Sequence, residues 1–319
     1  MSIQNKPFLP KIVAVLGTTA SGKTRLGVLI ASRFEGEIVS ADSRQVYKGM
    51  DIGTGKDLKE YIVQDQEGHS MEIPYHLIDM VRPDQDFSLA QFQKEAYRKI
   101  DDILSRKKLP VVVGGTGLYA QAIIEGYNLS SRGRDHLWRR EAEDLSAEEL
   151  FLKIRRKKPD FASKINPSDR KNKIRLIRYW EVLNQESSNL DFSAQPRYDS
   201  LVLGLTHPFE DLEKRIYNRL SERLDKEGMV EEVRRLQEGG LSWKRLESFG
   251  LEYKWIALYL QGKIDYPDMK EQLYTKIRKF AKKQLTWLRR WEKQGRKVNW
   301  VKSEKEALSL VDSFLQRKN

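Results

Sequence analysis

Eight consecutive residues near the N-terminus carry the clearest chemistry in this sequence. In these residues the pattern G-x-x-x-x-G-K-[ST] is matched at every position by Gly17, Thr18, Thr19, Ala20, Ser21, Gly22, Lys23 and Thr24. In this pattern the glycines let backbone N–H groups turn toward a phosphate, the lysine reaches its outer oxygens, and the final hydroxyl binds Mg²⁺. The stretch therefore predicts a site for a phosphate or diphosphate, with Thr24 as the metal ligand.

Two further polar stretches follow segments that read as buried strands. Residues 37–40 lead to the sequence DSRQ at 42–45, and residues 109–113 lead to GGT at 114–116. Ligands of open α/β sheets bind beyond the carboxyl ends of the strands, so Asp42 and Thr116 are expected to face the bound phosphate. Two plainer interpretations stay open: Asp42 as a helix N-cap, and the glycines as a place of close helix–strand packing.

Composition and charge narrow the class of protein. The chain has 319 residues and a net charge of +12. Because it contains no cysteine, disulfides, thiolate metal sites and cysteine nucleophiles are excluded. Residues 1–128 carry 16 basic and 16 acidic side chains, so the whole net charge lies in the remainder. A neutral phosphate-binding half joined to a basic half predicts a polyanionic partner, most simply nucleic acid. Because no apolar run approaches the roughly 20 residues of a membrane span and no signal peptide is found, we expect a cytoplasmic protein.

The elements that position these residues follow from hydrophobic periodicity. Residues 12–16, 37–40, 109–113 and 201–205 read as buried strands, and the residues after Pro208 read as helical throughout. Between about 127 and 197 the pattern is helical and basic, with Arg175 and Arg178 on one helix face. We therefore predict an α/β fold whose parts are a P-loop NTPase-like parallel sheet core (1–128 plus 199–206), a basic helical insertion (129–198) and a helical C-terminal region (207–319).

Two of the predicted C-terminal helices carry cations at regular spacing. Arg215, Arg219 and Arg223 are four residues apart, which is typical of a solvated face and also fits a row of arginines facing a diphosphate. In residues 273–291 lysines, arginines and two tryptophans surround an apolar face. This mixture suits RNA because bases stack on aromatic rings and phosphates pair with cations. The RNA contacts predicted on this helix are Lys279, Lys283 and Trp287.

Taken in order, the motifs resemble the tRNA dimethylallyltransferase (tRNA isopentenyltransferase) family over nearly the full length of the chain. The resemblance rests on the stretches GTTASGKT, DSRQVY, DIGTGK, YHLID, VVVGGTGLY, RIYNR, SFGLEYKW and FAKKQLTW. It implies transfer of a dimethylallyl group from dimethylallyl diphosphate to N6 of the adenosine beside the anticodon, at tRNA position 37, with release of diphosphate. Mg²⁺ as cofactor and the anticodon stem-loop of tRNA as partner come with the same resemblance.

The resemblance also implies roles for individual residues. Asp42 matches the carboxylate that accepts the N6 proton, and Thr116 matches its partner at the reaction centre. The P-loop becomes a diphosphate cradle, and Arg219 matches the arginine that steadies the leaving group, although Arg215 is close enough in register to compete. The positions that match tRNA contacts are Asp42, Ser43, Arg44, Gln45, Arg175 and Arg178.

Three other functions fit parts of the sequence. An adenylate isopentenyltransferase would prenylate free nucleotides on the same fold, but a nucleotide acceptor needs no long basic half. A P-loop nucleotide kinase or ATPase would bind ATP at residues 17–24, but such enzymes commonly carry an Mg²⁺-binding Asp where this chain has Gly114 and Gly115. A non-catalytic RNA-binding protein would not need Lys23, Thr24 and Asp42 intact. For the transferase we expect a monomer without membrane association.

Overall fold

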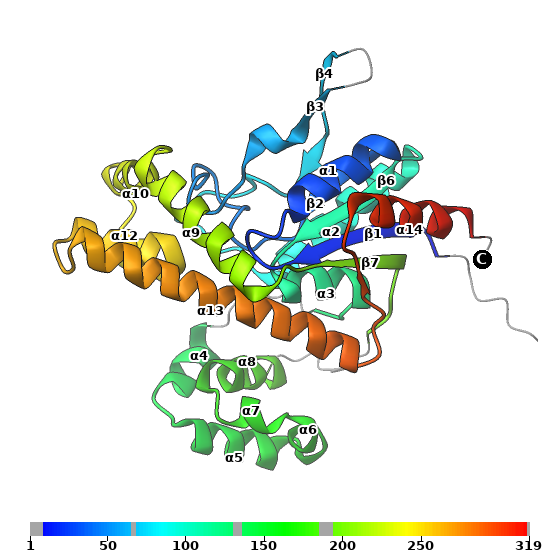
Figure 1. Cartoon of the computed structure of the whole chain (residues 1–319). Helices are drawn as coiled ribbons and strands as arrows, with labels where there is room; N and C mark the ends of the chain where they lie inside the picture. Colours follow the sequence, from blue (N-terminus) through cyan, green and yellow to red (C-terminus); the bar gives the residue numbers. More distant parts are fainter. Residues whose placement is uncertain (1–8, 65–67, 130–135, 185–193, 318–319) are drawn as a thin grey trace, which may run out of the picture. The chain divides into compact units, whose positions relative to one another are not determined.

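A six-stranded sheet carries the P-loop at the carboxyl end of one of its inner strands. The computed structural model describes residues 9–64, 68–129, 136–184 and 194–317. The strand order is β5–β2–β6–β1–β7–β8, and all neighbouring strands run parallel (Figure 1). The strands are β1 (Lys11–Gly17), β2 (Gly36–Ser40), β5 (Tyr75–His76), β6 (Leu109–Gly114), β7 (Asp199–Leu205) and β8 (Asn299–Trp300).

The predicted α/β class is confirmed, and β1, β2, β6 and β7 lie where the apolar runs place them. These runs are continuous because helices cover both faces of the sheet, which leaves no polar face on a strand. Strand β8 corrects the expectation that all residues after Pro208 are helical. With two residues each, β5 and β8 are too short for a periodic signal, and only their pairing with β2 and β7 makes them strands.

Helices form a layer on each face of the sheet (Figure 1). Because successive side chains of a strand point to opposite faces, Val13 and Val15 of β1 enter one core while Ile12 and Ala14 enter the other. The first core also contains side chains of α1 (Lys23–Arg33) and α14 (Glu304–Gln316). The second contains side chains of α2 (Leu89–Ser105) and α3 (Gly117–Glu125).

Five further helices pack beside the sheet around a third core. They are α9 (Phe209–Asp225), α10 (Met229–Glu238), α11 (Trp243–Ser248), α12 (Leu251–Leu260) and α13 (Tyr266–Lys293). Helix α13 is the longest of the described helices, with 28 residues, and it belongs to two cores. Leu273 and Ile277 lie in the core of the C-terminal helices, whereas Leu288 and Trp291 lie in the core between the sheet and the helices α2 and α3.

The chain divides into two units. Residues 1–126 and 196–319 form the first, so the C-terminal helices and the sheet belong together, and residues 127–195 form the second. The described residues of the second unit contain the helices α4 (His136–Glu143), α5 (Ala147–Lys157), α6 (Pro159–Lys164), α7 (Pro167–Arg170) and α8 (Lys173–Leu183). They enclose a small core of their own, in which Leu150, Ile154 and Leu176 are fully buried.

Shorter elements complete the first unit. A 3₁₀ turn, η1 (Leu58–Tyr61), precedes the antiparallel pair β3 (Ile62–Gln64) and β4 (Ser70–Glu72).

At the start of β2 the buried carboxylate of Glu37 binds the guanidinium of Arg106 and lies 2.8 Å from Nε2 of His76. The Arg106 contact in particular lowers the pKa of Glu37 to about 2.

Within the described ranges, no helix has both the length and the apolar character that a membrane crossing requires.

Candidate active site

A cavity of about 770 Å³ lies at the carboxyl ends of β1, β2 and β6. Residues from all three strand ends line it, together with residues of the loop 51–57 and of helices α9, α12 and α13. This is the edge at which ligands of open parallel sheets bind. All of these lining residues belong to the first unit, so the cavity is complete within it.

The P-loop forms one wall of this cavity. Its backbone takes positive φ angles at Ala20 (59°) and Gly22 (85°), and α1 begins at Lys23 directly after them. The turn and the helix N-terminus therefore supply backbone N–H groups at the place where a phosphate would sit. The hydroxyls of Thr18 and Ser21 are buried and have no hydrogen-bond partner among the described residues.

Two cations, Lys23 of α1 and Arg219 of α9, line the cavity close enough for their charges to interact. Lys23 is half-buried, and within the part of the chain that the structure describes its Nζ donates only to the Thr18 carbonyl, at 3.3 Å. Its burial and then the charge of Arg219 lower the pKa of Lys23 to about 8. An anion bound here would reverse both effects, because it would replace lost solvation and separate two like charges. The electrostatics therefore fit a multiply charged phosphate group.

Arg219 and Arg223 of α9 share one acidic partner, Asp57. Arg219 Nη2 lies 2.5 Å from Asp57 Oδ2, and Arg223 Nη2 lies 3.0 Å from Asp57 Oδ1. Against the opposing effect of burial, the two arginines hold the pKa of Asp57 below its usual range. Arg215, one turn earlier, is exposed and donates through Nε to the Ala20 carbonyl at 2.8 Å.

At the tips of β2 and β6 the structure brings Asp42 and Thr116 to the same cavity. Asp42 Oδ1 accepts a hydrogen bond of 2.9 Å from the backbone N–H of Arg44. The Thr116 hydroxyl accepts one of 3.1 Å from the N–H of Ser43, so the two strand ends are joined. Gly114 is required here, since a Cβ on it would lie 2.3 Å from the Ala41 carbonyl oxygen.

Comparison with known proteins assigns the chain to a family. Residues 45–291 match the family model described as IPP transferase. The chain is 42% identical over 309 residues, 97% of this chain and 96% of the relative, to tRNA dimethylallyltransferase 2 of Citrifermentans bemidjiense. It is 41% identical to tRNA dimethylallyltransferase 1 of Hahella chejuensis, with 99% and 100% of the two chains covered. This chain belongs to the IPP transferase family of tRNA dimethylallyltransferases.

A solved structure of the family supports the same assignment. The tRNA isopentenylpyrophosphate transferase of Bacillus halodurans superposes with a TM-score of 0.66 at 32% identity, and the alignment covers 96% of this chain and 95% of the other. The likeness therefore includes the C-terminal helices as well as the sheet. The resemblance inferred from the sequence motifs is confirmed.

The predicted site residues fall into four groups. Gly17, Thr18 and Ser21 of the P-loop are buried and do not line the cavity. Most of them line the cavity, namely Thr19, Ala20, Gly22, Lys23, Thr24, Asp42, Ser43, Arg44, Gln45, Thr116, Arg219, Lys283 and Trp287. Lys279 is exposed on α13 and does not line it. Arg175 and Arg178 lie on α8 in the second unit, where they pair with Asp169 and Glu181 respectively.

Two of the cavity residues have structural contacts that the sequence did not predict. Gln45 accepts a hydrogen bond of 2.8 Å from the Ser40 hydroxyl and donates one of 3.0 Å to the Gly55 carbonyl, so it braces the backbone. The Trp287 ring lies against Gly117, where an added Cβ would come within 2.2 Å of it. The glycines of the VGGTG turn are therefore needed for close packing as well as for the cavity.

Sequence reasoning missed Gln284 altogether. Its Oε1 accepts a hydrogen bond of 2.7 Å from the N–H of Thr19, and its Nε2 donates one of 2.9 Å to the Gly115 carbonyl. The side chain thereby ties the P-loop to the turn after β6. A signal was present, because Gln284 is the one polar residue on the buried face that α13 otherwise forms from apolar residues.

Four acidic residues of the cavity were also not predicted as site residues: Asp57, Glu60, Glu222 and Glu252. Burial raises the pKa of Glu252, which precedes the buried Tyr253 in the first turn of α12. Burial also raises the pKa of Glu60, and the charge of Asp57 adds to the effect. These residues come from parts of the chain far apart in sequence, so their meeting depends on the fold.

Proposed function

We propose that this protein transfers the dimethylallyl group of dimethylallyl diphosphate to N6 of the adenosine at tRNA position 37 and releases diphosphate. The observation that carries the proposal is the content of one cavity: an anion cradle with two cations, Lys23 and Arg219, on one side, and a carboxylate with a hydroxyl at the neighbouring strand tips. Family membership and the names of the relatives support the same reaction.

The diphosphate binds the P-loop, Lys23 and Arg219 in this proposal. The backbone N–H groups of residues 22–24 at the N-terminus of α1 face it, while the two cations pair with its outer oxygens. Arg219 suits this role better than Arg215, because Arg215 is exposed, whereas Arg219 is half-buried and its charge lowers the pKa of Lys23. Charge develops on the diphosphate as the allylic C–O bond breaks, so fixed cations at this place lower the barrier.

Mg²⁺ fits the same site through Thr24, which lines the cavity directly after Lys23. Among the described residues there is no group of three or more acidic or histidine side chains that could hold a metal by itself. Mg²⁺ characteristically binds one or two protein oxygens together with substrate phosphates, which agrees with a single hydroxyl here. When bound, the ion would neutralise part of the diphosphate charge.

Asp42 orients the attacking amine and accepts its proton. The exocyclic amine of adenine is a weak nucleophile and becomes acidic only as its nitrogen bonds to carbon, so a carboxylate beside it supplies both alignment and a proton acceptor. Thr116, held by the N–H of Ser43, offers a hydroxyl next to the same position. The adenine has to leave its stack to reach the cavity, which costs less in a loop than in a duplex.

The tRNA is held by basic and aromatic side chains in both units. Arg44, Lys283 and Trp287 lie at the cavity, with the Arg44 guanidinium 5.5 Å from the centre of the Phe249 ring. Arg175 and Arg178 add positive charge on the second unit. Cations that pair with phosphates and rings that stack on bases are what single-stranded RNA requires. We propose a monomer that acts in the cytoplasm, where its tRNA substrate resides.

The reaction is tested by incubating the protein with dimethylallyl diphosphate, Mg²⁺ and unmodified bulk tRNA, followed by mass spectrometry of the nucleosides. We expect N6-dimethylallyladenosine with the wild-type protein and none with Lys23→Ala. Prenylated AMP or ADP in a parallel reaction, without product on tRNA, would instead identify a nucleotide prenyltransferase. Consumption of ATP with no prenylated product in either reaction would overturn the proposal.

A further inference from the structure

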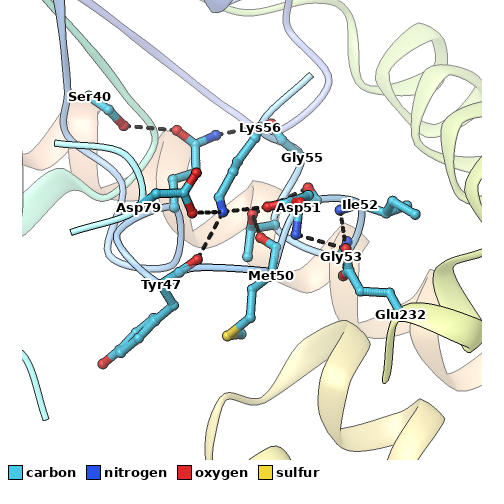
Figure 2. A network of polar contacts seen from close by, with 12 residues as sticks. Ser40, Tyr47, Met50, Asp51, Ile52, Gly53, Gly55, Lys56, Asp79 and Glu232 are labelled. Atoms are coloured by element: carbon cyan, nitrogen blue, oxygen red, sulfur yellow. Dashed lines mark hydrogen bonds and ion pairs between the residues drawn. The ribbon is translucent and has the colours of Figure 1, made fainter. Parts of the chain in front are cut away.

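The loop at residues 51–57 forms one wall of the cavity, yet none of its side chains was predicted to act in the reaction. It contributes Gly53, Thr54, Gly55 and Asp57 to the lining. Figure 2 shows that buried polar groups hold this loop from two sides. A surface loop would not need such support, which raises the question of what the loop holds in place.

On one side the loop is bound by Glu232 of α10, whose side chain is buried. Its Oε2 accepts hydrogen bonds from the N–H groups of Asp51 (2.8 Å) and Ile52 (2.7 Å), and its Oε1 accepts one from Gly53 (3.0 Å). The Tyr253 hydroxyl donates a fourth, of 2.7 Å, to Oε1. Both carboxylate oxygens are therefore occupied by donors, so three successive residues of the loop have fixed positions.

On the other side the loop is anchored by its own residue Lys56, whose side chain is fully buried. Its Nζ donates to the Tyr47 carbonyl (2.8 Å), Asp51 Oδ1 (2.6 Å) and Asp79 Oδ1 (2.5 Å), which uses all three of its hydrogens. The next residue, Asp57, has a φ of 43°. A non-glycine residue is held in that region only when its surroundings determine it.

The loop in turn holds the two arginines of α9. Asp57 accepts hydrogen bonds from Nη2 of both Arg219 and Arg223. The arginines also lie directly against the loop backbone, because a Cβ on Gly55 would come within 2.4 Å of Arg223 Nη2 and 2.5 Å of Arg219 Nη2. A shift of the loop would therefore move Arg219 relative to Lys23.

We propose that Glu232 is a positioning residue of the diphosphate site, which fixes Arg219 through the loop 51–57 and Asp57. Glu232 does not line the cavity and acts only through these intermediates. The inference rests on the proposed role of Arg219 in diphosphate binding. Tyr253 donates to Glu232 and packs against Gly53. We therefore expect Tyr253 to contribute to the positioning of Arg219 as well, with a smaller effect than Glu232.

The test measures binding of inorganic diphosphate with Mg²⁺ to the full-length protein by titration calorimetry. Glu232→Gln keeps the size of the side chain but replaces one accepting oxygen with an NH₂ group, which cannot accept from the loop. We expect about a tenfold rise in the Kd for diphosphate, since small displacements of a binding group have large effects. The tRNA affinity is expected to stay unchanged. Glu231→Gln, next to it on α10 and exposed, serves as the matched control.

A double-mutant cycle separates positioning from a general loss of structure. If Glu232 acts through Asp57, Glu232→Gln adds less than twofold to the Kd in an Asp57→Asn background. A full tenfold effect in that background, or an unchanged Kd in the wild-type background, would overturn the inference. Should Glu232→Gln fail to fold, Tyr253→Phe removes one donor and leaves the carboxylate in place, and a several-fold rise in Kd is then expected. An unchanged Kd for Tyr253→Phe would count against the proposal.

This experiment is independent of the proposed reaction. A protein that forms no N6-dimethylallyladenosine, but whose diphosphate affinity depends on Glu232 through Asp57, would refute the transferase and leave the positioning role standing. An active transferase whose diphosphate affinity does not depend on Glu232 would refute the positioning role and leave the proposed reaction standing.

Discussion

The lowered pKa of Lys23 gives the diphosphate site a measurable proton signature. In the ligand-free protein, burial and the neighbouring Arg219 bring this pKa from 10.5 to about 8. A bound diphosphate places negative charge beside the ammonium group and thereby returns its pKa toward the ordinary value. Diphosphate binding is therefore expected to take up a proton at Lys23 wherever the lysine is neutral in the free protein.

The size of the uptake follows from the two pKa values. At pH 9 a group with a pKa of about 8 is roughly 10% protonated, whereas one with its ordinary pKa is almost fully protonated. Binding at pH 9 should then take up about 0.9 proton at Lys23, and at pH 7 only about 0.1. By linkage the affinity falls nearly tenfold for each pH unit above about 8, until the pKa of the bound state is reached.

Titration calorimetry in two buffers with different ionisation enthalpies counts these protons. Diphosphate itself titrates in this range, so the uptake by Lys23→Arg, which stays protonated at all relevant pH values, is subtracted. We expect a difference of nearly one proton at pH 9 and almost none at pH 7. Equal uptake by the two proteins at pH 9 would refute the argument that Lys23 and Arg219 share one anion.

Three further results are expected. Asp42→Asn should keep its tRNA affinity and lose about 10²- to 10⁴-fold in turnover, measured with saturating tRNA, because the amide cannot accept the N6 proton. Gln284→Leu leaves a backbone N–H and a carbonyl unpaired, so urea denaturation should show a loss of about 2–4 kcal/mol in unfolding free energy, and no loss would contradict the contacts described. Glu37→Gln should lower the unfolding free energy by about 2–3 kcal/mol near neutral pH. Because the pKa of Glu37 is depressed, its contribution is present above about pH 4.5 and disappears as the pH falls toward 2.

The parts of the fold that the sequence predicted are those with local signals. The apolar run before Gly17 and the glycine-lysine pattern after it define a strand, a phosphate-binding turn and a helix within 24 residues. The site was harder to predict from the sequence, because the contact of Gln284 with Thr19 spans 265 residues and depends on how α13 packs against the rest of the first unit.

Charge pairs deep in the cavity were the least predictable. A spacing of four residues placed Arg219 and Arg223 on one face of a helix, but it could not distinguish a solvated stripe from a buried pair. Only the loop 51–57, which brings Asp57 between them, settles that Arg223 is buried. The roles of Asp42, Thr116 and Thr24 in the reaction stay predictions for the experiments above.

Helix α13 contributes side chains to two cores, and this couples the unfolding of the two parts of the first unit. Its N-terminal half completes the core of the C-terminal helices, and its C-terminal half completes the core between the sheet and the helices α2 and α3. Melting either half removes contacts from one core and, because helix formation is cooperative, weakens the other half, so neither core can be lost while the other keeps its full stability. We therefore expect hydrogen exchange to show the P-loop strand and the helices α9–α12 opening together, as one cooperative body. The site would then vanish in a single step, without a partly folded form that still binds one of its substrates.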